Sequence, residues 1–322
     1  MDQSLLIRYL DVPCDLIMCD EVDSTNDALK RIARSQHIPQ DVVSYSVHHD
    51  KRKEGQEAPL IAIAQRQTAG RGRFGREWVS PPGSIYCSMM YTLHVDGSCL
   101  AALPLVVGCA LHEALSMTVA ETNTSKSKAA APLYIKWPND IVACRHGSKD
   151  KLAGILVEVL PGPDPQANSS HVIIGMGVNV FRPFQNEYTA KQACYVNDLW
   201  NEESLVDQSA QSRAQKPISS LSLEMVAASV INAVFAHVNT WMKSSFMFAP
   251  FKDHYEQNMA LRGDEVVARR LDGSMFAQGT VLGVNEHGQL LIQEPKSTDL
   301  QEKVITITVG DITLRNAEEI RL

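Results

Sequence analysis

The sequence predicts an α+β fold in which a large mixed domain is followed by a small all-β module. Short runs of β-forming residues alternate with helical patterns up to residue 260, which is typical of a sheet covered by helices. From residue 263 onward, short strands separated by Gly turns replace that pattern. We therefore expect a large α+β domain over residues 1–260 and a separate small β-barrel over residues 263–322.

A helix is predicted at the sequence DSTNDALKRIARS, where Ser24 or Thr25 serves as the N-cap and Asp27 lies in the first turn. Later elements follow from β-propensity and apolar periodicity. They are strands at 59–67 and 83–93, an apolar helix at 100–120 with Pro104 near its start, a strand and turn at 133–140, a hairpin at 141–160 turning at Gly147–Ser148, a strand at 171–180 and a helix at 221–243.

Composition narrows the classes of function. The chain has 322 residues and a net charge of −7, so a general polyanion-binding surface is not expected. Its seven cysteines include no C-x-x-C pair, and their number is odd, which favours a reducing compartment over a disulfide framework or a zinc site. We find no signal peptide and no apolar run of 18 residues, so we expect a cytoplasmic protein without a membrane span.

The sequence TAGRGRFGREW, residues 68–78, is cationic and rich in glycine within an acidic chain. Glycine lets a backbone approach a ligand closely, and arginine presents a planar fork suited to phosphate or carboxylate. We expect this loop to order over an anionic small molecule, with Trp78 as an apolar lid or a base-stacking face. The residues concerned are Gly70, Gly72, Gly75, Arg71, Arg73 and Arg76.

Two other interpretations of this loop stay open. An arginine–glycine segment can bind RNA, although such segments are usually repeated in basic chains and this one occurs once in an acidic chain. A solvent-exposed loop without a ligand is the other alternative. The loop is not a P-loop, because no Gly-Lys-Ser/Thr sequence follows it.

Two further motifs carry chemistry. In KWPND, Lys136 lies among apolar neighbours, which predicts a partly buried ammonium group that needs an anionic partner. Asn139 and Asp140 are equally well explained as turn formers. In GMGVN, Gly175 and Gly177 interrupt a buried strand, which indicates close approach of backbone or ligand.

Taken in chain order, these motifs resemble the biotin–protein ligase family, also called holocarboxylase synthetases. The matching sequences are DSTN (23–26), QTAGRGRFGREW (67–78), KWPND (136–140), KLAGILVE (151–158) and GMGVNV (175–180). The resemblance implies a mixed central sheet with helices, similar to the catalytic domain of class II aminoacyl-tRNA synthetases. It also implies that the C-terminal module is an SH3-like β-barrel.

The resemblance implies an enzyme that activates biotin with ATP and Mg²⁺. The biotin carboxylate attacks the α-phosphorus, which gives biotinyl-5′-AMP and pyrophosphate. A lysine of a biotin-carboxyl-carrier domain then attacks the mixed anhydride, and AMP leaves. Two anions must meet in the first step, so the protein mainly has to offset charge and hold geometry.

The resemblance also implies which residues form the site. Lys136 would be the central catalytic cation, and Arg73 would act with it. Contacts to biotin fall on Ser24, Thr25, Gln67, Gly70, Arg71, Gly72, Lys136, Gly154 and Ile155. Contacts to ATP or the adenylate fall on Arg71, Arg73, Arg76, Trp78, Lys136, Asn139 and Asn179. No protein ligand is assigned to a metal, because Mg²⁺ would arrive with ATP.

The sequence departs from the family in several places. About 20 residues precede Asp23, where some members carry a winged helix, so we expect no sequence-specific DNA binding. Phe74 replaces an arginine of some members, which lowers the loop's charge but should preserve its role as a lid. Residues 193–199 differ from the usual segment near the adenine. Residues 48–58, 121–131 and 201–216 are insertions of unknown purpose, and homodimer formation stays open.

Lipoate–protein ligases are the main alternative within the same chemistry. They typically contain an R-R-x-x-G-G-G sequence, which this chain lacks. A nucleic-acid-binding module that uses the Gly/Arg loop is the alternative from a different class. Its affinity would fall steeply with salt and would not depend on biotin or ATP.

Overall fold

The structure is a computed structural model of the chain. It describes residues 1–35, 37, 43–48, 50, 52, 58–120, 132–145, 148–163, 169–183, 193–200, 221–295, 303–308 and 312–316. The insertions predicted at 121–131 and 201–216 lie outside the described residues, as do Gly147 and most of 48–58.

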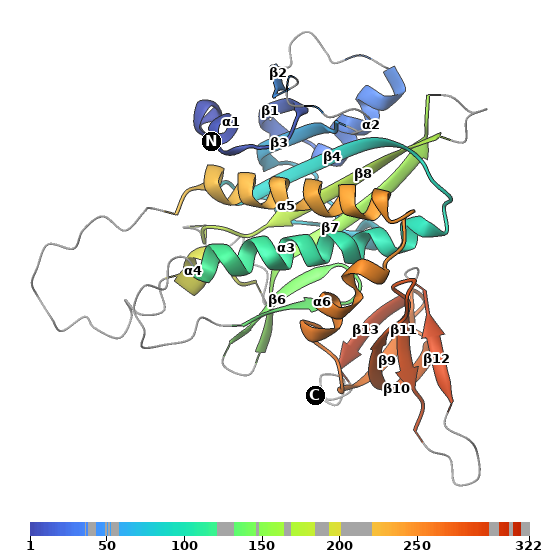
Figure 1. Ribbon diagram of the computed structural model, residues 1–322. Coiled ribbons are helices and arrows are strands. Elements are labelled where there is room, and N and C mark those ends of the chain that lie inside the picture. The colour runs from blue at the N-terminus through green and yellow to red at the C-terminus, as the bar shows by residue number, and fades with distance from the viewer. Residues whose placement is uncertain are drawn as a thin grey trace, which may run out of the picture.

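A sheet of eight strands organises the larger part of the molecule (Figure 1). Its order is β2-β1-β3-β4-β8-β7-β6-β5, in which β1 and β3 run parallel and all other neighbours are antiparallel. This arrangement confirms the predicted mixed sheet. The strands are β1 (Cys14–Val22), β2 (Ser44–Val47), β3 (Leu60–Gln67), β4 (Ile85–His94), β5 (Leu133–Lys136), β6 (Asp140–Arg145), β7 (Ser148–Pro161) and β8 (Ser169–Val178).

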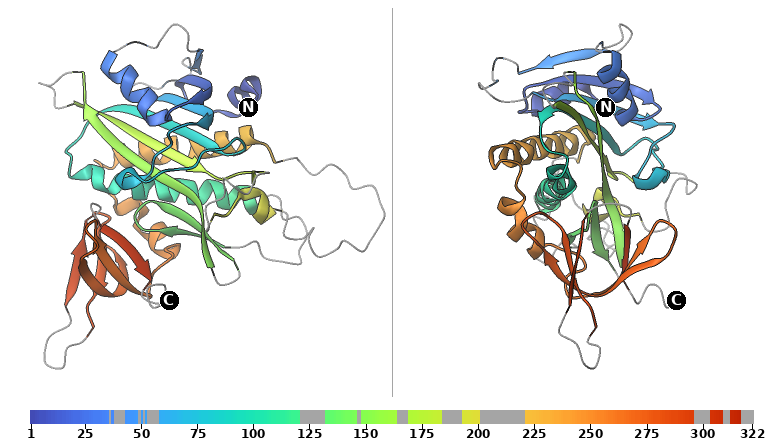
Figure 2. Two further views of the ribbon diagram at one scale, coloured as in Figure 1. Left: turned by 180° about the vertical axis from the view of Figure 1, so that it is seen from behind. Right: turned by 90° about the vertical axis from the view of Figure 1, so that its right-hand side faces the viewer.

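Two long helices lie side by side on one face of this sheet, as Figures 1 and 2 show. They are α3 (Leu103–Ala120), which follows the short helix η3 (Cys99–Ala102), and α5 (Leu223–Lys243). Both are apolar and long enough to cross a membrane, with mean hydropathies of 1.7 and 1.2, although no such span was expected from the sequence. In the most apolar stretch of Cys99–Ala120 and of Leu223–Lys243, 72% and 56% of the stretch is buried inside the protein, which explains the apolar composition.

Helix α2 (Thr25–Ser35) covers the opposite face of the sheet. Neighbouring strand residues alternate between the two faces: Leu16 belongs to the main core, whereas Ile17 packs with Leu29 and Ile32 of α2. The helices α3 and α5 on one face and α2 on the other thus give the strands two buried sides. The helices α1 (Gln3–Tyr9) and α4 (Val196–Trp200) complete the larger part, and α1 packs against α5.

The C-terminal part is a five-stranded antiparallel sheet in the order β12-β11-β10-β9-β13, which fits the expected SH3-like module. It is reached through η5 (Ala249–Phe251) and α6 (Lys252–Gln257). Its strands are β9 (Glu265–Arg270), β10 (Met275–Val284), β11 (Leu290–Gln293), β12 (Val304–Ile307) and β13 (Ile312–Asn316). The predicted division between residues 260 and 263 stays a prediction.

A histidine pair joins α3, α6 and β5. His112 Nε2 lies 3.1 Å from the Leu133 carbonyl oxygen and must donate to it, because a carbonyl only accepts. Neutral His112 therefore accepts at Nδ1, and His254 Nε2 donates to it across 3.2 Å. Burial lowers the pKa of both rings below the ordinary value of 6.5, against an opposing pull from the nearby Glu113 carboxylate.

We expect a low pH to lower the free energy of unfolding through the pair His112 and His254. Because the folded state favours the neutral rings, their stabilisation is present above the unfolded pKa of about 6.5 and is lost as pH falls below it. The free energy of unfolding in urea should therefore drop between pH 7 and 5, and His237 and Glu113 are the charged or ionisable groups that face the pair. The drop should shrink in His254→Gln but persist in His94→Gln, which changes an exposed histidine on β4. An unchanged slope in His254→Gln would contradict the assignment.

Candidate active site

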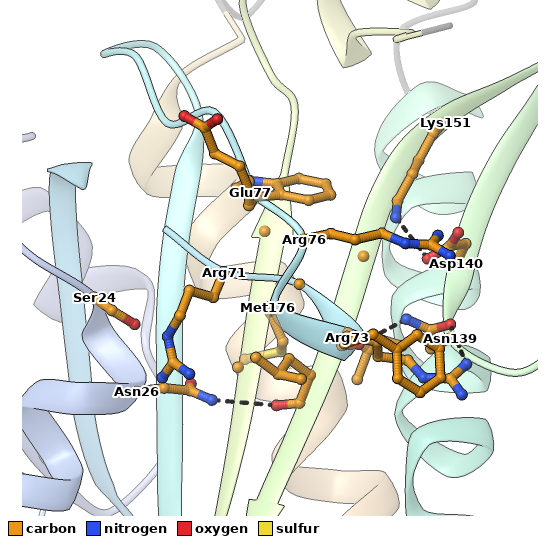
Figure 3. Close-up of a pocket in the computed structure, with 18 of the residues that line it drawn as sticks. Ser24, Asn26, Arg71, Arg73, Arg76, Glu77, Asn139, Asp140, Lys151 and Met176 are labelled. Atoms are coloured by element: carbon orange, nitrogen blue, oxygen red, sulfur yellow. Dashed lines mark hydrogen bonds and ion pairs between the residues drawn. The ribbon is translucent and has the colours of Figure 1, made fainter. Parts of the chain in front are cut away.

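A cavity of about 490 Å³ lies on the α2 side of the sheet (Figure 3). Its walls come from five segments that are far apart in sequence: the start of α2, the Gly/Arg loop, the turn between β5 and β6, the beginning of β7, and β8. Each segment contains one of the five motifs identified in the sequence. The fold therefore brings the motifs together in one site.

Glycines make the floor of this cavity. Gly154 on β7 and Gly177 on β8 are paired across the two strands, on the face opposite α3. A Cβ atom at Gly177 would lie 2.6 Å from the Trp78 ring, and one at Gly154 would lie 2.9 Å from it. The indole thus rests directly on bare backbone, which confirms the close approach predicted for Gly177.

Gly177→Ala should lower stability and ligand binding more than Gly97→Ala does. The added methyl group would overlap the Trp78 ring, and overpacking of this kind typically costs about 1–3 kcal/mol. We expect a lower unfolding midpoint in urea and weaker ligand binding by calorimetry. Gly97→Ala is the matched control, because its Cβ would meet nothing within 4 Å. Equal effects of the two changes would exclude the proposed packing role.

The Gly/Arg loop, called the lid loop below (residues 68–78), is closed by its own backbone. Gly72 N donates to Arg76 O at 2.7 Å, and Trp78 N donates to Gly70 O at 2.9 Å. Phe74 at its tip adopts a left-handed conformation with φ 59°. The Arg73 guanidinium lies 4.6 Å from the Phe74 ring centroid and that of Arg76 lies 5.9 Å from it, so the aromatic ring offsets two neighbouring cations.

Side chains tie the lid loop to both sides of the cavity. Arg71 Nη2 lies 2.5 Å from Asp27 Oδ1 on α2 and 3.6 Å from Glu158 Oε2 on β7. On the other side, Arg73 Nη1 donates to Asn139 Oδ1 at 3.2 Å. Figure 3 shows this division, with Arg71 close to Asn26 and Ser24, and Arg73 close to Asn139. The loop is therefore held over the floor at two points.

Two lysines enter the cavity. Lys136, at the end of β5, is half-buried, and among the described residues no hydrogen bond or ion pair involves its ammonium group. Lys151, at the start of β7, lies 2.8 Å from Asp140 Oδ1 and 4.9 Å from the centroid of the Trp78 ring. Lys136 thus provides an uncompensated positive charge, and Lys151 provides one that a carboxylate already holds in place.

The polar residues expected to bind biotin form a connected group at the α2 end of the cavity. Gln67 Oε1 accepts from Thr25 N at 2.9 Å, and Gln67 Nε2 donates to Ser80 Oγ at 3.0 Å. Ser24 is 4% exposed and lines the cavity. These bonds fix the Gln67 amide, so its orientation is set before a ligand arrives. Gly72 and Ile155 line the cavity as well.

Two predicted residues do not line the cavity. Gly70 lies at the base of the lid loop, where a Cβ atom would be 2.5 Å from Trp78 O, so glycine lets the two ends of the loop approach each other closely. Asn179 Nδ2 donates to Lys151 O at 3.2 Å, and its backbone N donates to Leu152 O at 3.0 Å. The structure therefore places Asn179 behind the cavity, where it fixes the backbone that carries Lys151.

Several lining residues were not predicted from the sequence as ligand contacts, and they include Asn26, Glu77, Asp140, Lys151, Leu156 and Met176. Lys151 is the main omission. Lys151 is the first residue of KLAGILVE, which contributes to the family resemblance, but its partner depends on the register of the hairpin. That register pairs Asp140 with Gly154 and Val142 with Lys151, which puts a carboxylate beside the ammonium group.

A mixed sheet with a cationic lid loop over a glycine floor is consistent with the class of biotin and lipoate protein ligases. The model of the biotin/lipoate A/B protein ligase family matches residues 32–179. The chain is 31% identical to the biotin–[acetyl-CoA-carboxylase] ligase of Paracoccus denitrificans over an alignment of 248 residues. This alignment covers 76% of this chain and 88% of that protein. It is 28% identical to the bifunctional ligase/repressor BirA of Escherichia coli, over 80% of this chain and 67% of that one.

Solved structures agree with the sequence comparison. The biotin protein ligase from Aquifex aeolicus in complex with biotin and ATP matches with a TM-score of 0.62 and 25% identity, over 94% of this chain and 99% of that one. The chain belongs to the biotin protein ligase family.

Proposed function

We propose that this protein activates biotin with ATP to biotinyl-5′-AMP and transfers biotin to a lysine of a biotin-carboxyl-carrier domain. The observation that carries the proposal is the convergence of five cationic side chains on one small cavity with a glycine floor. They are Arg71, Arg73, Arg76, Lys136 and Lys151. The relative from Paracoccus denitrificans is named a biotin–[acetyl-CoA-carboxylase] ligase, which supports the same substrate and a carboxylase as acceptor.

In the first step, a biotin carboxylate oxygen bonds to the α-phosphorus of ATP and the bond from that phosphorus to the β-phosphate bridge breaks. Both reactants are anions, so the positive charge must be in place before they meet. Lys136 is our candidate for the cation that contacts both groups, because it has no counter-ion among the described residues. Lys151 is a second cation, held beside Trp78 and Gly154 at the floor.

In the second step, the amine of the carrier lysine bonds to the biotin carbonyl carbon, the anhydride C–O bond breaks and AMP leaves. An amine needs no activated protein nucleophile for this reaction, so the site must chiefly exclude water until the carrier arrives. The lid loop serves that purpose in our proposal. Its contacts to Asp27 and Asn139 hold it over the reacting atoms.

Magnesium is expected to enter with ATP, as Mg²⁺ usually binds one or two carboxylates together with phosphate oxygens and water. Among the described residues that line the cavity, Asp140 and Glu77 are the carboxylates that would be available to the ion, and Lys151 already pairs with Asp140. Among the described residues, no group of three or more His, Cys, Asp or Glu side chains forms a metal cage. The bound ion would share the charge of the phosphates.

The experiment that tests the function is the exchange of labelled pyrophosphate into ATP, with biotin and with lipoate as the control acid. Exchange that requires biotin supports the proposal, and exchange with lipoate alone would show a lipoate–protein ligase instead. The lack of pyrophosphate exchange with either acid would contradict the activation of a carboxylic acid by ATP. Binding of RNA that falls with salt and ignores both acids would instead favour the nucleic-acid alternative.

The cellular setting is part of the proposal. We expect a cytoplasmic enzyme, because all seven cysteines are free, and buried thiols such as Cys14 and Cys87 have a raised pKa and little reactivity. No sequence-specific DNA binding, membrane association or obligatory dimer is required by the chemistry.

A further inference from the structure

The turn that follows Lys136 makes a hydrogen bond to the C-terminal module through one indole. Trp137 follows Lys136 directly, is 2% exposed, and contributes to the cavity wall. Its Nε1 donates to the carbonyl oxygen of Gly288 across 3.3 Å. Gly288 lies in the turn between β10 and β11 of the five-stranded sheet, 151 residues away in sequence.

The turn that accepts this hydrogen bond, residues 285–289, is fixed by its own contacts. Asn285 Oδ1 accepts from the backbone N of His287 and of Gln289, each at 3.0 Å. Backbone bonds close the same turn, from Asn285 N to Gln289 O at 3.0 Å and from Gly288 N to Asn285 O at 2.9 Å. The Gly288 carbonyl therefore presents a rigid acceptor to Trp137.

The turn is also packed into the larger part of the molecule. Gly288 has φ +74°, which a side chain would strain, and its Cβ would lie 3.0 Å from Leu105 of α3 and 3.6 Å from Phe248. A substituent at this position would push the turn away from α3 and from Trp137. Glycine thus allows the C-terminal module to reach the wall of the cavity.

We propose that Trp137 is a positioning residue, through which the turn 285–289 holds Lys136 in the geometry of the adenylation step. The inference rests on the proposed function. The ammonium group of Lys136 has no partner among the described residues, so its place is set by the backbone at the end of β5. Trp137 anchors that backbone on one side, and Ile135 anchors it through backbone bonds to Asn258 and Ala260. A displacement of about 1 Å at a reacting group can cost roughly 10²-fold in rate, which makes such an anchor consequential.

The test compares four variants with the full-length wild type. Trp137→Phe keeps an aromatic ring but removes the N–H donor, and Asn285→Ala loosens the turn without touching the cavity. Asn285→Asp keeps an oxygen that accepts both backbone N–H groups and should rescue the turn. Trp241→Phe is the matched control, since Trp241 is fully buried and its Nε1 has no partner in the part of the chain that the structure describes.

We expect Trp137→Phe and Asn285→Ala to lower kcat of biotin-dependent pyrophosphate exchange by about tenfold, with the Kd of biotin nearly unchanged. Hydrogen–deuterium exchange of the peptide covering residues 133–142 should rise in the same two variants. Asn285→Asp and Trp241→Phe should behave like the wild type in both measurements.

Wild-type kcat in Trp137→Phe, or a loss that only follows the fraction of folded protein, would overturn the inference. Unchanged deuterium uptake in residues 133–142 would overturn it as well, and this readout needs no activity. A wild type that fails to exchange pyrophosphate would instead count against the proposed function, so the two failures are distinguishable.

Discussion

Replacing Lys136 by alanine should nearly abolish adenylate formation while leaving the fold intact. Removing one preorganised cation from a site of developing charge typically lowers the rate by roughly 10²–10³. Lys136 lines the cavity and has no ion-pair partner among the described residues, so its removal breaks no internal salt bridge. The measurement is kcat of biotin-dependent pyrophosphate exchange, together with urea unfolding to show that stability is retained.

Lys151→Ala tests which of the two lysines is central. Its loss would also leave Asp140 without the cation now 2.8 Å away, so we expect a fall in stability in addition to a fall in kcat. Lys252→Ala is a suitable control, because Lys252 pairs with the exposed Glu286 on a different surface. Near-normal exchange in Lys136→Ala with severe loss in Lys151→Ala would transfer the central role to Lys151.

Arg73→Gly should produce an enzyme that makes biotinyl-5′-AMP but does not retain it. The substitution removes the hydrogen bond to Asn139 that ties the lid loop to the turn between β5 and β6. A hydrogen bond involving a charged group contributes about 1.5–3 kcal/mol, which corresponds to adenylate loss at least about tenfold faster. The adenylate that stays bound after gel filtration, and biotin on the lysines of a bystander protein, measure the effect.

Arg66→Gly provides the matched control for this prediction. Arg66 lies close to the lid loop in sequence, but its partner Glu21 and its own side chain are about half exposed, and neither lines the cavity. Its removal should leave adenylate retention and labelling specificity unchanged. If Arg73→Gly retained its adenylate as well as Arg66→Gly, the lid loop would not be the barrier to release.

Much of the fold was predictable because its signals are local. The strand at Leu60–Gln67 and the helix at Leu223–Lys243 follow from β-propensity and apolar periodicity, and both were placed within about two residues. The strand order was not predictable from these signals. The place of β8 between β4 and β7 depends on contacts between distant segments, which no local pattern encodes.

The candidate site shows the same limit. Arg71 was expected to face the ligand, and it lines the cavity, yet its guanidinium also pairs with Asp27 and Glu158. The sequence identified the arginine from its loop, but its counter-ions come from α2 and β7. Asn179 was expected at the adenylate and lies behind Lys151 instead. The motifs therefore predicted which segments meet in the cavity. The contacts of individual side chains could not be predicted, because they depend on the register between the strands and on the packing of distant segments.

The hydrophobic core runs without interruption from the eight-stranded sheet into the C-terminal strands. Leu105 and Phe248 belong to the same buried cluster as Val266, Val281 and Leu290. A chain cut near residue 262 would leave apolar surface of the larger part in water, at about 25 cal/mol per Å². The two modules are thus distinct in architecture but joined in folding: they should unfold as one cooperative unit, and neither should be expected to persist when the other is removed.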